Sequence, residues 1–155
     1  MEVSVNNSRT EQVQIVSQSD LNGYKRLFGG KLMEWIDIVA GVTARRHCSK
    51  NVTTVMVDKL HFKKAAYAND VIVLRGKVTY VGKTSMEVCV KSYIESVTGE
   101  RQLINTAYFI MVALDENENP TEVPRLILET EEDKKEWERG KKRYELRKKR
   151  RVQHY

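Results

Sequence analysis

The stretch Asn22-Gly-Tyr-Lys-Arg-Leu-Phe-Gly-Gly-Lys-Leu-Met-Glu-Trp-Ile-Asp37 decides the fold of this chain, because it combines a loop, a pair of glycines and the start of a helix. The predicted helix, residues 31–47, is apolar over most of its circumference, and a helix of that kind is buried inside a protein. The alternating apolar residues of the chain after it predict strands. We therefore expect a sheet that wraps around this helix.

The predicted strands give the class of the fold. Four of them follow the helix and are joined mostly by short turns, such as Gly82-Lys83 and residues 98–100, which favours antiparallel pairing. The last strand is apolar on both faces, which predicts a central place in the sheet and cover from a second subunit. We expect an α+β domain, with an antiparallel sheet of about five to six strands wrapped around one central helix. The predicted strands are residues 10–17, 53–62, 71–80, 84–94 and 102–115.

Composition places the chain among ordinary globular proteins. Its 155 residues fit one domain, and 41% hydrophobic with 31% charged residues are typical of a chain that folds in water. No apolar run approaches the ~20 residues of a membrane helix, and the first residues lack the basic-then-apolar order of a signal peptide. We therefore expect a cytoplasmic protein in which Cys48 and Cys89 are free thiols. Residues 1–128 are expected to form the domain, and residues 129–155 a charged helical C-terminal extension.

The C-terminal extension holds most of the excess positive charge, with 11 Lys+Arg against 7 Asp+Glu in a chain of net charge +6. Its acids come first and its bases last, the order that the helix dipole favours. We expect Trp137 and Tyr144, seven residues apart, to dock on the domain, and Gly140 to weaken the helix between them. A solvated amphipathic helix is the simplest interpretation. Nucleic-acid binding is the alternative, but the interspersed acids argue against it, and we expect no nucleic-acid partner.

Residues of the opening stretch can act together on a carbonyl group. After Gly29 and Gly30, the free N–H groups at the start of the helix favour negative charge on an oxygen. Asp37 lies two turns further on among apolar neighbours, so we expect it to be partly buried and to act as a general base. Asn22 can hold a water or the carbonyl. From the residues alone, the alternatives are tight packing for the glycines, a charge at the helix rim for Asp37 and a turn for Asn22.

The spacing of several motifs over residues 8–126 resembles that of a known family. The first is Asn22-x6-Gly29-Gly30-x-Leu-Met-x-Trp-Ile-Asp37. It is followed by Val52-Thr-Thr-Val-x-Val-Asp58-x-Leu-x-Phe62 and Val81-Gly-Lys-Thr-Ser-Met86. In order and spacing, these motifs resemble the hotdog-fold acyl-CoA thioesterases. Within that family the chain is most similar to the bacterial acyl-CoA hydrolases related to the cytosolic brain-type enzyme.

The resemblance implies a hotdog fold, pairing into dimers and commonly trimers of dimers, and hydrolysis of fatty acyl-CoA at the dimer interface. By position, Asp37 matches the carboxylate that activates water, and Gly30 matches the helix-start N–H that polarises the thioester carbonyl. Asn22 matches the polar partner, which the other subunit supplies. No metal or redox cofactor is implied, because coenzyme A is part of the substrate. The implied substrate contacts are Gly29, Thr54, Phe62, Lys63, Lys64, Gly82, Lys83, Thr84 and Ser85.

Several alternatives stay open at this point. Direct attack of Asp37 on the thioester, through an enzyme anhydride, competes with attack by an activated water. A hotdog that only binds acyl-CoA or a nucleotide as a sensor is the second functional class, although such a binder has no need of a base. A hydratase on the same fold needs a histidine beside the aspartate, and the stretch from Asn22 to Asp37 contains none. The simplest interpretation of the Gly82-Lys83-Thr84-Ser85 segment is a hairpin turn, and a contact with a phosphate is the alternative.

Overall fold

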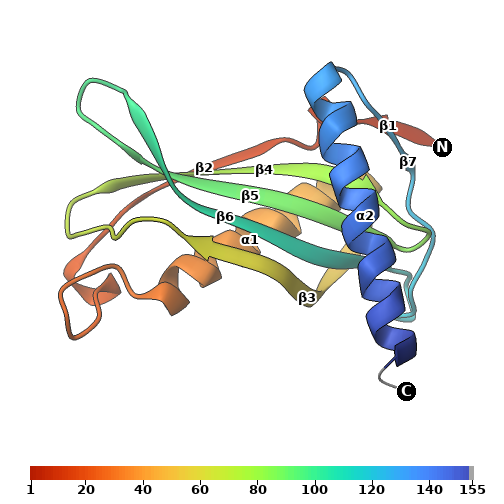
Figure 1. The fold of residues 1–155 in the computed structure, drawn as a ribbon, viewed down its shortest axis with the longest axis horizontal. Helices are drawn as coiled ribbons and strands as arrows, with labels where there is room; N and C mark the ends of the chain where they lie inside the picture. The colour runs from red at the N-terminus through yellow and green to blue at the C-terminus, as the bar shows by residue number, and fades with distance from the viewer. Residues whose placement is uncertain (154–155) are drawn as a thin grey trace.

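A computed structural model describes residues 1–153 of the chain. Its main sheet has five antiparallel strands in the spatial order β2-β4-β5-β6-β3, and helix α1 (Gly29–Cys48) lies against one face of this sheet (Figure 1). The α+β fold with one central helix, predicted from the sequence, is confirmed, and each predicted strand is found within two residues of its expected bounds. The strands are β2 (Thr10–Ile15), β3 (Asn51–Phe62), β4 (Val71–Val81), β5 (Ser85–Glu95) and β6 (Arg101–Leu114).

Helix α1 forms the core together with the inner face of the sheet. Its buried residues recur every three to four positions, which is the spacing of one face of a helix. The opposite face is open: Ile38 is 48% exposed and Val42 is 36% exposed, although the sequence indicated burial on nearly all sides. The helix ends at Ser49, whose left-handed backbone lets its N–H bond to the Arg45 carbonyl at 2.8 Å. The buried residues of α1 are Leu32, Trp35, Ile36, Val39, Ala40, Thr43, Ala44, His47 and Cys48.

A small second sheet joins the two ends of the domain. Strand β1 (Glu2–Ser4) pairs in parallel with β7 (Arg125–Ile127), and single 3-10 turns lie at η1 (Val5–Asn7) and η2 (Gln18–Asp20). Neither β1 nor β7 was predicted, because three residues are too few for an alternating pattern. The small sheet brings the N-terminal residues beside the segment that leads to the C-terminal helix.

Helix α2 (Glu131–Gln153) lies across the outer face of the main sheet, opposite α1 (Figure 1). The rings of Trp137 and Tyr144 lie 4.3 and 5.3 Å from the Tyr80 ring of β4, so the predicted docking of both aromatics is confirmed. A Cβ at Gly140 would lie 2.8 Å from the Tyr80 Cβ and 2.9 Å from Glu87 Oε1. Gly140 therefore has a packing role that the sequence did not reveal, because its missing side chain lets α2 approach the sheet.

Buried ion pairs fasten α2 to the sheet. Glu87 of β5 has no exposed side-chain surface; it accepts hydrogen bonds from the Thr79 hydroxyl at 2.6 Å and from the Arg143 guanidinium at 2.8 Å. Arg147 pairs at 2.9 Å with Asp58 of β3, and both side chains are 5% exposed. The outer face of β6 is covered in part by this helix, since the Arg143 guanidinium lies 4.0 Å from the centroid of the β6 Tyr108 ring. Cover of the remaining apolar surface by a second subunit stays a prediction.

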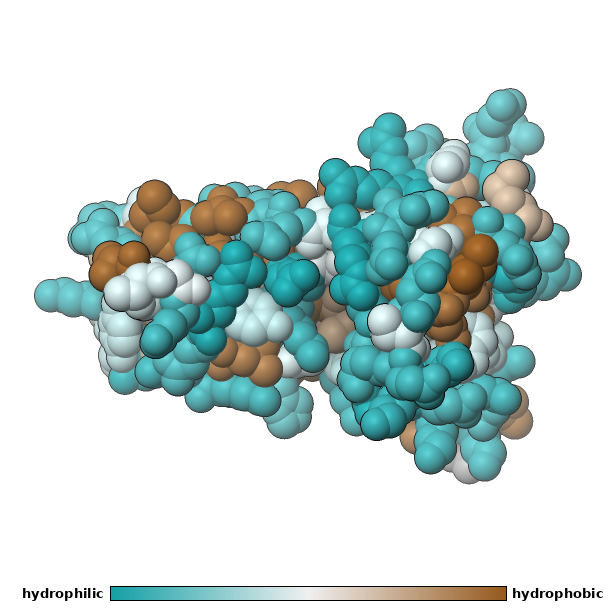
Figure 2. Space-filling model, turned by 90° about the horizontal axis from the view of Figure 1, so that it is seen from above, coloured by the Kyte–Doolittle hydropathy of each residue, from teal (hydrophilic) through white to brown (hydrophobic). Residues whose placement is uncertain are grey.

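The exposed apolar surface lies instead on the edge strand. Val55, Met56, Val57 and Phe62 of β3 are each more than a third exposed, and β3 has no neighbour on its outer side. Hydrophilic side chains dominate the surface seen in Figure 2, with hydrophobic patches toward both ends of the molecule. None of the helices in residues 1–153 combines the length and the apolar character needed to cross a membrane. The predicted free thiols are confirmed, and both cysteines are buried.

Candidate functional site

Asp37 of α1 and Thr54 of β3 meet where the helix faces the edge of the sheet. The Thr54 hydroxyl donates a hydrogen bond to Asp37 Oδ1 at 2.6 Å and lies 3.3 Å from the sulfur of Met111. A register irregularity between Thr54 and Met56 interrupts the pairing of β3 with β6 at this point. Asp37 is exposed in the single chain, so its expected partial burial was wrong. The reason is its place at the open edge of β3, which the apolar residues beside it in the sequence do not reveal.

The glycine pair begins α1 and leaves backbone donors free. The N–H groups of Lys31 and Leu32 bond to the Phe28 carbonyl, at 3.0 and 3.1 Å. Among residues 1–153, no acceptor lies within hydrogen-bond distance of the N–H of Gly29 or Gly30. A Cβ at Gly30 would lie 2.6 Å from the Phe28 ring, so only glycine fits beneath that ring where it now lies. Unpaired N–H groups at the start of a 20-residue helix are suited to stabilise an oxyanion.

Gly30 and Asp37 of one chain are too far apart to act on the same carbonyl. They are seven residues apart in α1, and at 1.5 Å rise per residue this is about 10 Å along the helix axis. An oxyanion donor and a base that holds the attacking water must both lie within about 3 Å of the reacting atoms. Within one chain, Gly30 and Asp37 therefore cannot act on the same carbonyl group.

Asn22 lies in a tight turn before the helix. Its Oδ1 accepts hydrogen bonds from the N–H of Tyr24 at 2.8 Å and of Arg26 at 3.3 Å, while its own N–H bonds to the Arg26 carbonyl. The turn interpretation of Asn22 is therefore confirmed. Its side-chain N–H₂ has no partner within residues 1–153 and is free to donate to a ligand.

Apart from Gly30, the predicted site residues fall into three groups in the structure. One cavity of about 410 Å³ gathers those at the start of α1 and the end of β3: Asn22, Gly29, Phe62, Lys63 and Lys64. The Asp37–Thr54 pair is the second group. The third is the β4–β5 hairpin, with Lys83, Thr84 and Ser85 in a cavity of about 190 Å³, next to Gly82. Along β6, the partners of Phe62 and Ser85 are seven residues apart, about 23 Å at 3.3 Å per residue.

Two basic residues that line the hairpin cavity were missed by the sequence analysis. Lys148 and Arg151 of α2 line the hairpin cavity together with Tyr144 and Arg147. A signal was present, because positions 144, 147, 148 and 151 have the i, i+3, i+4, i+7 spacing of one helix face. The spacing alone does not show which strand or hairpin that face meets.

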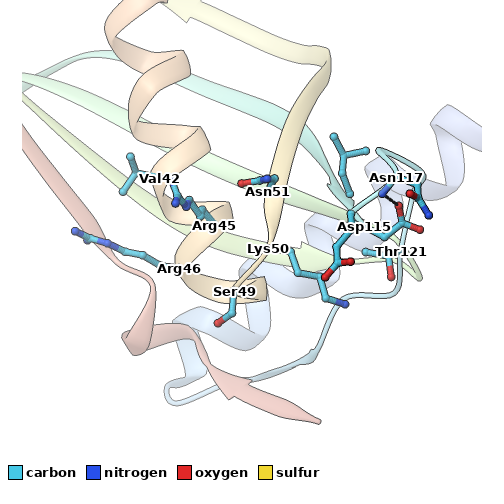
Figure 3. A pocket seen from close by; sticks show the side chains of 11 residues that line it. Val42, Arg45, Arg46, Ser49, Lys50, Asn51, Asp115, Asn117 and Thr121 are labelled. Carbon is cyan, nitrogen blue, oxygen red and sulfur yellow. Dashed lines mark hydrogen bonds between the residues drawn. The ribbon is translucent and has the colours of Figure 1, made fainter.

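A further cavity, of about 1040 Å³, contains none of the predicted site residues. Figure 3 shows it at the C-terminal end of α1, with side chains from the start of β3 and from the loop after β6. Arg46 is engaged there by the Arg9 carbonyl and the Thr10 hydroxyl, and Asp115 accepts two backbone N–H groups of its own loop. Both side chains are therefore engaged by groups of the protein itself.

The titratable groups of the interior point to packing rather than chemistry. Burial lowers the pKa of His47, whose Nε2 lies 2.9 Å from the Pro124 carbonyl, and burial raises the pKa of Cys89 to about 11. Burial likewise raises the pKa of Tyr108 to about 12. Within residues 1–153, no group of three His, Cys, Asp or Glu side chains is placed to hold a metal ion.

Sequence comparison relates the chain to thioester hydrolases. A family model described as "Thioesterase superfamily" matches residues 24–99. YkhA of Bacillus subtilis, described as an uncharacterized acyl-CoA thioester hydrolase, is 45% identical over 115 residues, which are 74% of this chain and 67% of that protein. The cytosolic acyl coenzyme A thioester hydrolase of Rattus norvegicus is 34% identical over 144 residues. That match covers 91% of this chain but 38% of the rat protein, so the chain spans well under half of its length.

Solved structures agree with this relation. The acyl-CoA hydrolase of Staphylococcus aureus, determined with butyryl coenzyme A, coenzyme A and coenzyme A disulfide, matches with a TM-score of 0.93 at 32% identity. The match covers 99% of this chain and 94% of that one. An apo-hexameric acyl-CoA thioesterase matches with a TM-score of 0.91 at 40% identity, over 96% of both chains. Further structures of the S. aureus protein carry single alanine substitutions at an asparagine, a threonine and an aspartate.

Proposed function

The chain belongs to the Thioesterase superfamily, with acyl-CoA thioester hydrolases as its relatives, and on that premise we propose that it hydrolyses fatty acyl-CoA to a free fatty acid and coenzyme A. The observation that carries the proposal is the 2.6 Å hydrogen bond that holds the Asp37 carboxylate at the open edge of the sheet. A carboxylate oriented in this way can take a proton from a water beside it. Thr54 fixes one oxygen of Asp37 and leaves the other free to accept that proton.

The S. aureus variants support this assignment. In that protein the substituted asparagine precedes the substituted aspartate by 15 residues, and the aspartate precedes the substituted threonine by 17. Asn22, Asp37 and Thr54 have the same separations in this chain. All three are polar groups that the structure leaves accessible or free to donate. They are therefore the residues that we assign to the reaction, together with Gly30.

We assign the complete site to two subunits. Gly30 lies about 10 Å from Asp37 along the helix, so a second copy has to supply the oxyanion donor. The free edge of β3 and the exposed apolar residues beside it form the surface that a twofold pairing would bury. If two β3 strands pair antiparallel, the start of α1 in one subunit lies beside the hairpin end of the other. A trimer of such dimers is the assembly that we propose.

The reaction then follows from three groups. Asp37 accepts a proton from water while the water oxygen bonds to the thioester carbonyl carbon. The carbonyl oxygen becomes an oxyanion that accepts a hydrogen bond from the N–H of Gly30 of the partner subunit, and Asn22 of the partner subunit orients the carbonyl or the water. Collapse of the tetrahedral intermediate breaks the C–S bond, the electron pair leaves on sulfur, and the proton held by Asp37 passes to the thiolate. Direct attack by Asp37 through an anhydride is the competing route.

The remaining predicted residues are proposed as substrate contacts. Phe62, Gly29, Lys63 and Lys64 all line the cavity at the start of α1. The hairpin from Gly82 to Ser85 is proposed as a contact for the phosphates of coenzyme A. We also propose a boundary between the domain and its C-terminal extension at residues 128/129. A cytoplasmic location is proposed in line with the cytosolic rat relative. No metal or other cofactor takes part in these steps.

Hydrolysis of a panel of acyl-CoAs, from short to long chain, tests the proposal. Replacing Asp37 by asparagine keeps the size of the side chain and removes the base, so kcat should fall by about 10²–10⁴-fold. Glu34→Gln, at another exposed position one turn earlier on α1, is the matched control and should leave kcat unchanged. Unchanged activity of Asp37→Asn would refute the site. Absence of wild-type activity on every chain length would favour the sensor. After one turnover in ¹⁸O-labelled water, label in the Asp37 carboxylate would indicate the anhydride route.

A further inference from the structure

The hairpin cavity between β5 and α2 concentrates unpaired positive charge. It is lined by Lys83 of the hairpin and by Lys148 and Arg151 from the last turns of α2. None of these three has a carboxylate within 4.0 Å in the part of the chain that the structure describes. The fourth cation, Arg147, differs because Asp58 neutralises it at 2.9 Å. Three cations around about 190 Å³ repel one another, and an anion in the cavity would relieve that repulsion.

The same cavity offers hydrogen-bond donors and an apolar wall. The hydroxyls of Thr84 and Ser85 line it and have no hydrogen-bond partner within residues 1–152. Its other side is formed by Val55, Ile110 and Val112, with the Tyr144 ring next to them. Cations, hydroxyls and an aromatic face are the groups that bind a phosphorylated nucleotide, because they hold the phosphates and cover the base.

The hairpin is held in place by neighbours on two sides. Arg125 donates a hydrogen bond to the Gly82 carbonyl at 2.6 Å, and the Gly82 N–H bonds to the Ser85 carbonyl at 2.9 Å. A Cβ at Gly82 would lie 3.0 Å from the Tyr144 ring, so α2 packs directly on the turn. The buried pairs of Glu87 and Arg147 fix α2 in turn. The cations are therefore presented by a rigid frame, which lowers the entropy lost on binding.

We propose that α2 completes the nucleotide subsite for the substrate, with Lys148 and Arg151 binding phosphates of the coenzyme A moiety together with Lys83. This inference rests on the proposed function. Val55, which lines the cavity, directly follows Thr54, the partner of Asp37, along β3. Thr54 points to α1 and Val55 points to α2, on opposite faces of the sheet, so the flexible pantetheine arm has to lead from the phosphates on the outer face to the reacting groups on the inner face. The basic end of α2 is a substrate-binding element, with a role beyond solvation of the surface.

The double variant Lys148→Gln/Arg151→Gln tests this proposal. Its KM for acyl-CoA should rise about tenfold or more, since each charge-assisted contact contributes about 1 kcal/mol or more, while kcat stays within twofold. Its KM for the matching acyl-pantetheine, which lacks the nucleotide, should not change. Lys141→Gln/Lys142→Gln removes two equally exposed charges of the same helix outside the cavity and is the matched control. Binding of 3′,5′-ADP, measured by calorimetry, should weaken tenfold in the first variant only.

Each contrary result has a defined meaning. Equal KM values for the two double variants would overturn the proposal, and so would a rise of KM on acyl-pantetheine, which indicates a distorted protein. Noncompetitive inhibition of wild type by 3′,5′-ADP would also overturn it, because the cavity would then bind a free nucleotide apart from the substrate. If wild type hydrolyses no acyl-CoA, the proposed function fails. In that case the calorimetric comparison of wild type and variants still tests whether Lys148 and Arg151 bind 3′,5′-ADP.

Discussion

Replacing Glu87 by alanine is expected to destabilise the protein more than any surface substitution, because it leaves a cation without its partner under α2. Glu87 is fully buried and bonds to both Thr79 and Arg143. Breaking one side of a buried ion pair costs about 3–5 kcal/mol. Arg143 keeps 13% of its side-chain surface exposed, so water can reach part of the guanidinium. We therefore expect the lower end, about 3 kcal/mol, which corresponds to a fall in Tm of about 6–12 °C.

A double-mutant cycle isolates the pair from the packing around it. The variants are Glu87→Met, Arg143→Met and the combination, each followed by urea unfolding and by thermal unfolding. Since two apolar side chains of similar volume leave no unpaired charge, the combined variant should be more stable than Glu87→Met alone. Additive losses from the two single substitutions would refute the reasoning, because they would show that the charges contribute independently. The cycle also reports on the hairpin cavity, since weaker docking of α2 should weaken binding of 3′,5′-ADP in Glu87→Met.

Three further predictions concern other positions. Thr54→Val removes the hydrogen bond that orients Asp37 and should lower kcat about tenfold, whereas Thr54→Ser should retain most of it; equal rates for the two would contradict the role. Burial lowers the pKa of His47 in the folded protein, so on acidification the unfolded chain binds a proton at this residue before the folded chain does. The contribution of His47 to the free energy of unfolding should therefore be constant above about pH 7 and should fall from about pH 6.5 downward. The free energy of unfolding, measured with urea, should fall less steeply with pH in His47→Gln than in wild type. The two slopes should differ by at most about 1.4 kcal/mol per pH unit. Gly140→Ala should destabilise by about 1–3 kcal/mol despite alanine's higher helix propensity, and a more stable Gly140→Ala would show that the contact with the Tyr80 Cβ relaxes freely.

Long periodic segments account for the part of the fold that could be predicted. The apolar pattern of α1 and the alternation of the four strands after it indicated the central helix and the sheet, because burial on one face imposes those periods. The order of the strands within the sheet could not be predicted from such patterns. β3 follows α1 in the chain and yet forms the sheet edge beside β6, and its residues have no local signal for that place. The exposure of Asp37 was missed for this reason.

The candidate site was predictable as a set of residues but not as an arrangement. The motif spacing named Asn22, Gly30, Asp37 and Thr54, and the structure joins only Asp37 to Thr54. The others lie at the far end of the same helix, a separation that follows from the helical rise and not from the identity of the residues. The spacing of Lys148 and Arg151 places them on one face of the predicted helix. Which strand or hairpin lies against that face depends on how α2 crosses the sheet. Contacts between elements are set by tertiary packing, which no single segment encodes.

The 10 Å between Gly30 and Asp37 along α1 has a genetic consequence if two subunits share each site. A chain with Asn22→Ala and a chain with Asp37→Asn are each inactive alone, since every dimer of either kind lacks one group at both sites. Coexpressed, they form mixed dimers in which one site carries both defects and the other carries none. With random pairing, half of the dimers are mixed, so about a quarter of the wild-type sites are restored. Two defective alleles would thus complement each other inside one oligomer.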